Sequence, residues 1–122
     1  MNDREMIEKW IAVFGKDLEE TLIEDHVTSE GNLLWHIFTW GNVPCLEEDE
    51  ARKAFDALQY TEAFRFCGGY SNQIEDLSIV GKTSAKEMDE APESDVYLVA
   101  KDFAWTYVRT HEPLGPYLCI RK

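Results

Sequence analysis

The chain lacks the apolar runs and leader segments of membrane and secreted proteins. No stretch approaches the roughly 20 apolar residues that a helix needs to cross a bilayer. The opening residues, MNDREMIEKW, contain neither an apolar signal core nor a small-residue cleavage site. The sequence therefore predicts a cytoplasmic protein that does not contact membranes.

Cysteine is also scarce, and its spacing argues against cross-links. Cys45, Cys67 and Cys119 are odd in number, far apart in the sequence and without a C-x-x-C pair. A chain of 122 residues is long enough to bury an apolar core without disulfides. We therefore expect reduced, buried thiols and one domain that spans residues 1–122.

Basic residues are few: the chain has 12 Lys and Arg but 24 Asp and Glu, which gives a net charge of −12. Residues 1–95 hold 22 acidic and 8 basic residues, whereas residues 96–122 hold 2 and 4. A field of this sign repels phosphate backbones, which argues against nucleic-acid binding. It attracts basic proteins, so a basic protein partner is one interpretation. The other is that the acidity only keeps the protein soluble.

Two stretches carry the apolar spacing of amphipathic helices. The first runs from Asp3 to Phe14, with Gly15 as its stop, and its apolar residues fall on one face: Met6, Ile7, Trp10, Ile11 and Phe14. The second runs from Glu47 to Leu58, with a buried stripe of Ala51, Ala54, Phe55 and Leu58. Shorter helices are expected at residues 17–26 and after Ser84, which forms a capping-box pattern with Glu87.

The second helix opens on four consecutive acids, residues 47–50. Acidic side chains in a first turn interact favourably with the positive end of the helix dipole. Neighbouring helical acids point in different directions, and no glycine-bearing calcium-loop spacing surrounds them. We therefore predict a solvated first turn here and no metal site.

Several short stretches are rich in aromatic and branched residues and predict strands: residues 33–40, 63–67, 74–80, 96–100, 103–110 and 117–121. Residues 33–40 are apolar on both faces, which is typical of a central strand. Lys101 and Asp102 are expected to form a tight turn. Alternation then places on one face Phe103, Trp105, Tyr107, Arg109 and His111. The predicted fold is α+β, with an antiparallel sheet of about four to six strands against two or three helices, in a single layer on one face.

Three sequence blocks resemble an uncharacterised family of small proteins from Bacillus and relatives, domain of unknown function 4275. The first block is Gly31 with LLWHIFTW, and the second is the acidic and apolar pattern around Ala51, Ala54 and Phe55. The third is DVYLVAKDFAWTYVRTHEPLGPY, the most specific of the three. Together they cover most of residues 31–58 and 95–117. The resemblance implies no established activity, cofactor or catalytic residue.

Two histidines are the candidates for chemistry, because histidine changes charge near neutral pH. If the strands that carry them are neighbours, His36 and His111 meet at one sheet edge beside Trp105 and Glu112. Such a group suits a ligand or acid–base site. The alternative is structural: a core His36, and local hydrogen bonds from residues 110–112 to the following turn. No nucleophile motif or metal-ligand spacing accompanies them, so we predict neither catalytic residues nor a metal or cofactor.

Two functions of different class remain open for this bacterial-type sequence. The favoured one is a non-enzymatic binding module that masks a basic protein surface, as small immunity or inhibitor proteins do, with exposed aromatics such as Trp40 and Tyr70 as contacts. The alternative is a small enzyme or ligand-binding protein with its site near His36, Trp105, His111 and Glu112. The oligomeric state is left open by the sequence.

Overall fold

The structure is a computed structural model, and it describes residues 3–15, 45–58, 62–67, 75–76, 83–92, 95–110 and 115–120. The described helices are α1 (Asp3–Phe14), α3 (Glu48–Ala57) and α4 (Ala85–Glu90). The described strands are β1 (Leu46–Glu47), β2 (Ala63–Cys67), β3 (Glu75–Asp76), β4 (Val96–Ala100), β5 (Trp105–Arg109) and β6 (Tyr117–Ile120). The predicted strand at 33–40 and helix at 17–26 lie outside the described residues.

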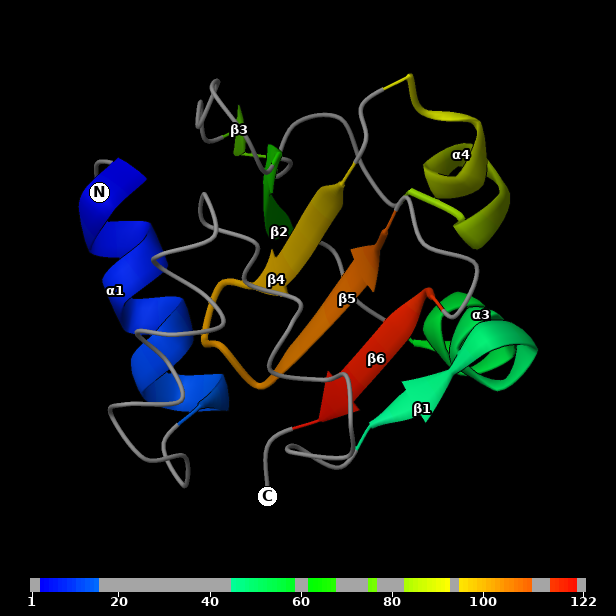
Figure 1. Cartoon of the computed structure of the whole chain (residues 1–122), viewed down its shortest axis with the longest axis horizontal. Coiled ribbons are helices and arrows are strands. Elements are labelled where there is room, and N and C mark those ends of the chain that lie inside the picture. The colour runs from blue at the N-terminus through cyan, green and yellow to red at the C-terminus, as the bar shows by residue number, and fades with distance from the viewer. Residues whose placement is uncertain are drawn as a thin grey trace.

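The described strands form one antiparallel sheet in the order β1-β6-β5-β4-β2-β3 (Figure 1). Its centre is a run of three well-paired strands, β4, β5 and β6, joined in chain order. Both outer strands of the described sheet contain two residues and carry acids, Glu47 in β1 and Glu75 and Asp76 in β3. Short, charged outer strands offer little backbone for pairing with another copy. The α+β prediction with four to six antiparallel strands is confirmed.

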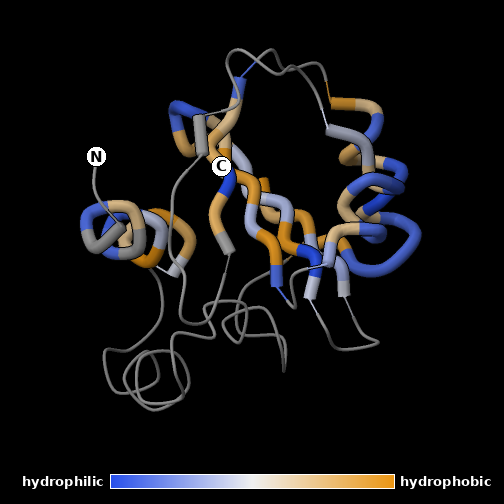
Figure 2. Tube along the Cα trace, turned by 90° about the horizontal axis from the view of Figure 1, so that it is seen from above, coloured by the Kyte–Doolittle hydropathy of each residue, from blue (hydrophilic) through white to orange (hydrophobic). Residues whose placement is uncertain are grey.

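Helices cover both faces of this sheet, so the predicted single layer on one face is wrong (Figure 2). On one face α1 inserts Met6, Trp10 and Phe14 against the sheet. The sheet residues in that cluster are Phe66, Tyr97, Val99, Val108, Tyr117 and Cys119. The strands therefore bury side chains on both sides, and each helix layer receives one half of the alternating pattern.

The opposite face is covered by α3 and α4 together (Figure 2). Ala51 and Phe55 from α3 and Ala85 and Met88 from α4 are buried there. Beneath them lie the alternate strand residues Val96, Leu98, Trp105, Tyr107 and Leu118. The predicted buried stripe of the second helix is confirmed, with Ala54 and Leu58 only partly buried at its margin.

The turn between β4 and β5 is longer than the predicted Lys101-Asp102 turn. The N–H of Phe103 donates to the carbonyl of Ala100 at 2.8 Å, and the Asp102 carboxylate accepts from the N–H of Ala104 at 3.0 Å. Phe103 has a φ of 59° and lies outside the strand, which begins at Trp105. Its ring belongs to the α1 cluster, with the Lys9 amine 4.7 Å from the ring centroid. The prediction that Phe103 shares a face with Trp105 and Tyr107 is therefore wrong.

Candidate functional site

The residues predicted to form a ligand site are only partly described. His36, His111 and Glu112 lie outside the described residues, as do Trp40 and Tyr70. Trp105 lies in β5, is 7% exposed, and meets the edge of the Phe55 ring with centroids 6.0 Å apart. In the described part of the chain, Trp105 is thus a core residue beneath α3. The grouping of His36, Trp105, His111 and Glu112 stays a prediction.

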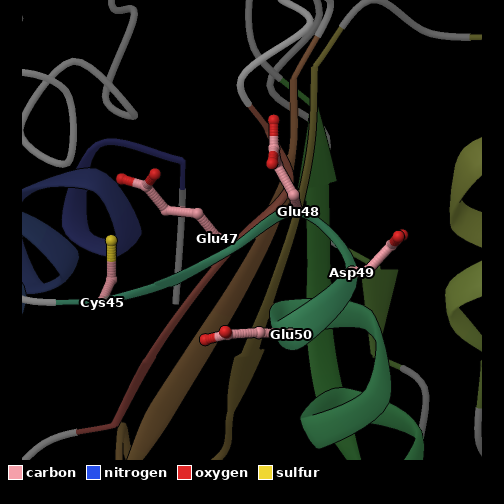
Figure 3. Close-up of a pocket in the computed structure, with 5 residues that line it drawn as sticks. All are labelled: Cys45, Glu47, Glu48, Asp49 and Glu50. Carbon is pink, nitrogen blue, oxygen red and sulfur yellow. The ribbon is translucent and has the colours of Figure 1, made fainter.

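A hollow of about 380 Å³ opens where β1 runs into α3 (Figure 3). We name it the acidic corner after its lining residues, Cys45, Glu47, Glu48, Asp49 and Glu50. All four acidic residues are exposed. They lie in the first turn of α3 or directly before it, where the positive end of the helix dipole stabilises carboxylates. Local sequence therefore accounts for the position of the acids.

Backbone geometry holds the acidic corner in place. The N–H of Glu48 donates to the carbonyl of Pro116 at 2.9 Å, which continues the β1–β6 ladder by one residue. Glu48 also has a φ of 54°, a conformation uncommon for residues other than glycine. The chain turns there from strand to helix without any spacer residue, and Glu47 makes no side-chain capping bond. The start of α3 is therefore tied to the sheet by its backbone.

The carboxylates of the acidic corner diverge (Figure 3). Glu48 and Asp49 point in different directions, and Glu50 points in a third. Asp49 accepts a hydrogen bond from Arg52 Nη1 at 2.8 Å. Within the described ranges, no group of three or more His, Cys, Asp or Glu side chains has the arrangement of a metal site. The divergence agrees with the prediction of a solvated first turn.

Cys45 forms the sulfur-bearing wall of this hollow. Burial raises the pKa of the Cys45 thiol to about 12, with smaller contributions from the Glu47 carboxylate and from Cys119. Burial likewise raises the pKa of the Cys119 thiol. Both thiols are free. At neutral pH they are therefore protonated, which makes each a weak nucleophile.

A second polar region lies between α3 and α4, and we name it the polar seam: Arg52, Asp56, Asp89 and Arg109. Asp56 accepts from the N–H of Ala85 at 2.8 Å, and Arg52 Nε donates to Asp89 at 3.0 Å. Arg109 donates from Nε and Nη2 to the carbonyls of Met88 and Ala91, each at 2.9 Å. Side chains of α3 and β5 thus hold both ends of α4.

The N-terminus of α4 carries the predicted capping box. The Ser84 hydroxyl accepts from the N–H of Glu87 at 3.2 Å, and the Glu87 carboxylate reaches back to the Ser84 backbone. A helix of 6 residues is too short to persist alone in water, so these bonds, the polar seam and the burial of Ala85 and Met88 together order it. The sequence pattern located the cap but contained no local signal for the polar seam.

Tyr107 lies beneath the polar seam with an unsatisfied hydroxyl. Its ring packs on Phe55 with centroids 4.0 Å apart, and the residue is fully buried. Within the described ranges, its hydroxyl oxygen has no hydrogen-bond partner. Burial, followed by the nearby Asp89 carboxylate, raises the pKa of Tyr107 above its usual value. The phenol therefore stays protonated throughout the physiological range.

Two large apolar side chains are exposed near the acidic corner, at the β1–β6 end of the described sheet. Leu46 is 37% exposed and pairs with Leu118, while Ile120 is 54% exposed and lies two residues further along β6. Diagonal neighbours of this kind are within side-chain reach of each other. Both share the sheet face that α3 covers. Exposed apolar side chains rimmed by charge are a feature of interaction surfaces. The sequence singled out neither residue, because exposure depends on which elements cover the sheet.

Comparison with known proteins identifies the family. The model for a domain of unknown function (DUF4275) matches residues 4–118, nearly the whole chain, and the protein belongs to that family. This confirms the resemblance seen in three sequence blocks and extends it to the N-terminal helix. Neither the curated proteins nor the solved structures contain a match. Among the described helices, none combines the length and apolarity required to cross a membrane.

Proposed function

We propose that this DUF4275 protein is a non-enzymatic, cytoplasmic binding module whose acidic corner docks against the basic surface of a protein partner. The proposal rests on the chain's net charge of −12 and on where part of that charge is exposed. Masking a basic surface needs carboxylates that are free to meet Lys and Arg side chains. It also needs apolar contact area, because exposed ion pairs alone contribute little affinity.

The observation that carries the proposal is that three carboxylates are exposed and form no ion pair with a described basic residue. Glu47, Glu48 and Glu50 are exposed, and no ion pair with a described basic residue engages them. Asp49 differs, because Arg52 already neutralises it. Three uncompensated charges on one turn repel one another, and a basic partner relieves that repulsion.

The exposed pair Leu46 and Ile120 supplies the apolar component. Leu46 lies between two residues of the acidic corner, so a partner that contacts the edge of the sheet meets carboxylates and apolar surface together. Steering by charge raises the association rate, and apolar burial slows dissociation. This combination favours a partner whose basic residues flank an apolar patch. The alternative ligand site at the two histidines has no specific support among the described residues.

The test is a comparison of two charge-matched variants as bait for proteins of the native lysate. The first, Glu47→Gln with Glu48→Gln and Glu50→Gln, removes three charges from the acidic corner. The second, Glu5→Gln with Glu8→Gln and Glu90→Gln, removes three exposed charges elsewhere. We expect the wild type and the second variant to retain the same basic protein at low salt and release it at high salt.

The first variant is expected to retain at least tenfold less of that protein, since three charge contacts are lost together. Retained proteins are identified and quantified by mass spectrometry. Equal loss from both variants would mean that only overall charge matters, which contradicts the proposed surface. If the wild type retains no basic protein at either salt, the binding function itself is wrong.

A further inference from the structure

Cys45 and Cys119 are 74 residues apart in the sequence, yet Cys45 directly precedes β1 and Cys119 lies in β6, the strand that pairs with β1. The antiparallel register of β1 and β6 pairs Leu46 with Leu118 and Glu47 with Tyr117. Continued by one residue, the same register places Cys45 across from Cys119. The ladder extends in the other direction too, because the N–H of Glu48 bonds to the carbonyl of Pro116.

The hydrogen-bond pattern also defines the type of position that the two cysteines occupy. In an antiparallel pair, hydrogen-bonded and non-hydrogen-bonded positions alternate. Because Glu48 and Pro116 form a bonded position, Cys45 and Cys119, three steps along the ladder, form a non-bonded one. The Cα atoms at such positions are about 4.5 Å apart, within the span that a disulfide bridges, roughly 4.4–6.8 Å.

Both side chains lie on the same face of the sheet. Cys119 is a member of the buried cluster beneath α1, and Cys45 packs against that cluster from the margin. The electrostatic influence of Cys119 on Cys45 is a separate indication that the two sulfur atoms are close. Cys45 is half-buried, whereas Cys119 is only 6% exposed, so a reagent in solvent meets Cys45 first.

We infer that Cys45 and Cys119 form a cross-strand dithiol that oxidises reversibly to an intramolecular disulfide, joining β1 to β6. The inference rests on register and packing and does not depend on the proposed partner. It identifies a modification site in a protein whose cysteine spacing gives no hint of a pair. The consequence is local: the disulfide fixes the strand that leads into α3 and lines one wall of the acidic corner.

The oxidant is a small-molecule disulfide, and the exchange balances in two steps. The Cys45 thiolate attacks one sulfur of the oxidant, forms a mixed disulfide and releases one small thiolate. The Cys119 thiolate then attacks the Cys45 sulfur and releases the second small thiolate. Two protein thiols become one disulfide, the oxidant is reduced to two thiols, and the two protons from the cysteines pass to the two leaving thiolates.

The experiment incubates the full chain with oxidised glutathione at mildly alkaline pH, where more of each buried thiol is ionised. Intact mass is then measured, followed by peptide mapping without reduction. We expect a loss of two hydrogens from the monomer and a linked peptide that contains Cys45 and Cys119. Cys67 is expected to be recovered either free or carrying glutathione. Reduced glutathione is expected to reverse the link.

Matched variants separate this pair from the remaining thiol. Cys67→Ala is expected to form the internal link as fast as the wild type, whereas Cys45→Ala and Cys119→Ala form none. Thermal denaturation of wild type, oxidised against reduced, is expected to show a Tm higher by roughly 5–15 °C, because the bridge closes a long loop.

Three outcomes would overturn the inference without any variant being needed. The first is the absence of an internal link in wild-type protein after prolonged oxidation. The second is a link that involves Cys67 or joins two chains. The third is a Tm that falls on oxidation, which would show that the two strands must distort before the sulfur atoms can meet.

Discussion

The two faces of the sheet are covered by helices that are held in different ways. Beneath α1 the contacts are mainly aromatic: Trp10 meets Tyr97 edge-on at 5.8 Å, and Phe66 stacks on Tyr97 at 4.8 Å. Beneath α4, by contrast, side-chain hydrogen bonds and an ion pair secure a helix with only two buried side chains. Apolar burial tolerates small shifts, whereas hydrogen bonds require defined positions, so the two faces are expected to respond differently to mutation.

The faces also treat buried hydroxyl groups differently. On the α1 face, the Thr106 hydroxyl accepts from Trp10 Nε1 at 2.9 Å and donates to the carbonyl of Leu98 at 2.8 Å. On the α4 face, the Tyr107 hydroxyl, one residue further along the same strand, has no partner among the residues that the structure describes. Neighbouring residues of β5 thus bury one satisfied and one unsatisfied polar group, which makes a direct comparison possible.

The largest expected effect is on the α1 face. Trp10→Ala removes a fully buried indole, leaves a cavity and takes away the N–H that donates to the Thr106 hydroxyl, which keeps its own bond to the carbonyl of Leu98. We expect the free energy of unfolding to fall by about 3–5 kcal/mol, measured by urea denaturation. Trp10→Phe is the control: it keeps most of the apolar volume and is expected to cost clearly less. Equal losses from the two variants would mean that the hydrogen bond, and not packing, dominates this face.

The next effect is on the α4 face. Arg109→Gln removes the two donors that hold the carbonyls of Met88 and Ala91. We expect a loss of about 1–3 kcal/mol in the free energy of unfolding, because partly buried carbonyls lose charge-assisted bonds. Hydrogen exchange measured by mass spectrometry is expected to rise in residues 85–90 and to stay unchanged in α1. An equal rise in both helices would contradict the independence of the two faces.

A pair of hydroxyl deletions on β5 is expected to change stability in opposite directions. Thr106→Val leaves Trp10 Nε1 without its acceptor and is expected to cost about 1–2 kcal/mol. Tyr107→Phe removes a hydroxyl that is buried without a bond, and we expect it to stabilise the protein by up to about 1 kcal/mol. Thermal and urea denaturation measure both. A loss of stability in Tyr107→Phe would show that the hydroxyl is bonded in solution, for example to an internal water.

The smallest effect is expected at the ion pair of the polar seam. Arg52 and Asp89 are 34% and 36% exposed at their side chains, so solvent screens their attraction. Asp89→Asn is expected to change the free energy of unfolding by less than about 1 kcal/mol, and the change should shrink as salt is raised. A salt-independent loss above that size would mean that the pair is more deeply buried in solution.

Much of the described fold follows from local periodicity. The bounds predicted for the first helix, Asp3–Phe14, and for the strands at 63–67 and 96–100 agree with the structure. The acidic helix was predicted one residue too long at each end. These segments succeed because apolar spacing within one element is decided by neighbours in sequence. The predicted face of Phe103 is wrong because its φ of 59° interrupts the alternation and turns its ring to the other face.

The candidate sites were harder to predict from the sequence than the helices and strands. The acids at residues 47–50 were recognised, and their divergence was expected from helical geometry. The sequence did not predict the exposure of Ile120 or the unbonded hydroxyl of Tyr107. Each depends on what the other described elements leave uncovered or unbonded. The pairing of Cys45 with Cys119 depends on strand register, which no local pattern in this chain reveals.

The amino-acid sequence by itself determined the α+β class, the positions of the first helix, the acidic helix and the strands at 63–67 and 96–100, and the acidic charge, because these arise from composition and from periods of two and 3.6 residues. Only the tertiary structure decided that helices cover both faces of the sheet, since an apolar face does not specify which segment packs on it. The same holds for the polar seam, the unsatisfied hydroxyl and the opposed cysteines. Each joins residues that are distant in sequence, and strand register and helix docking bring them together.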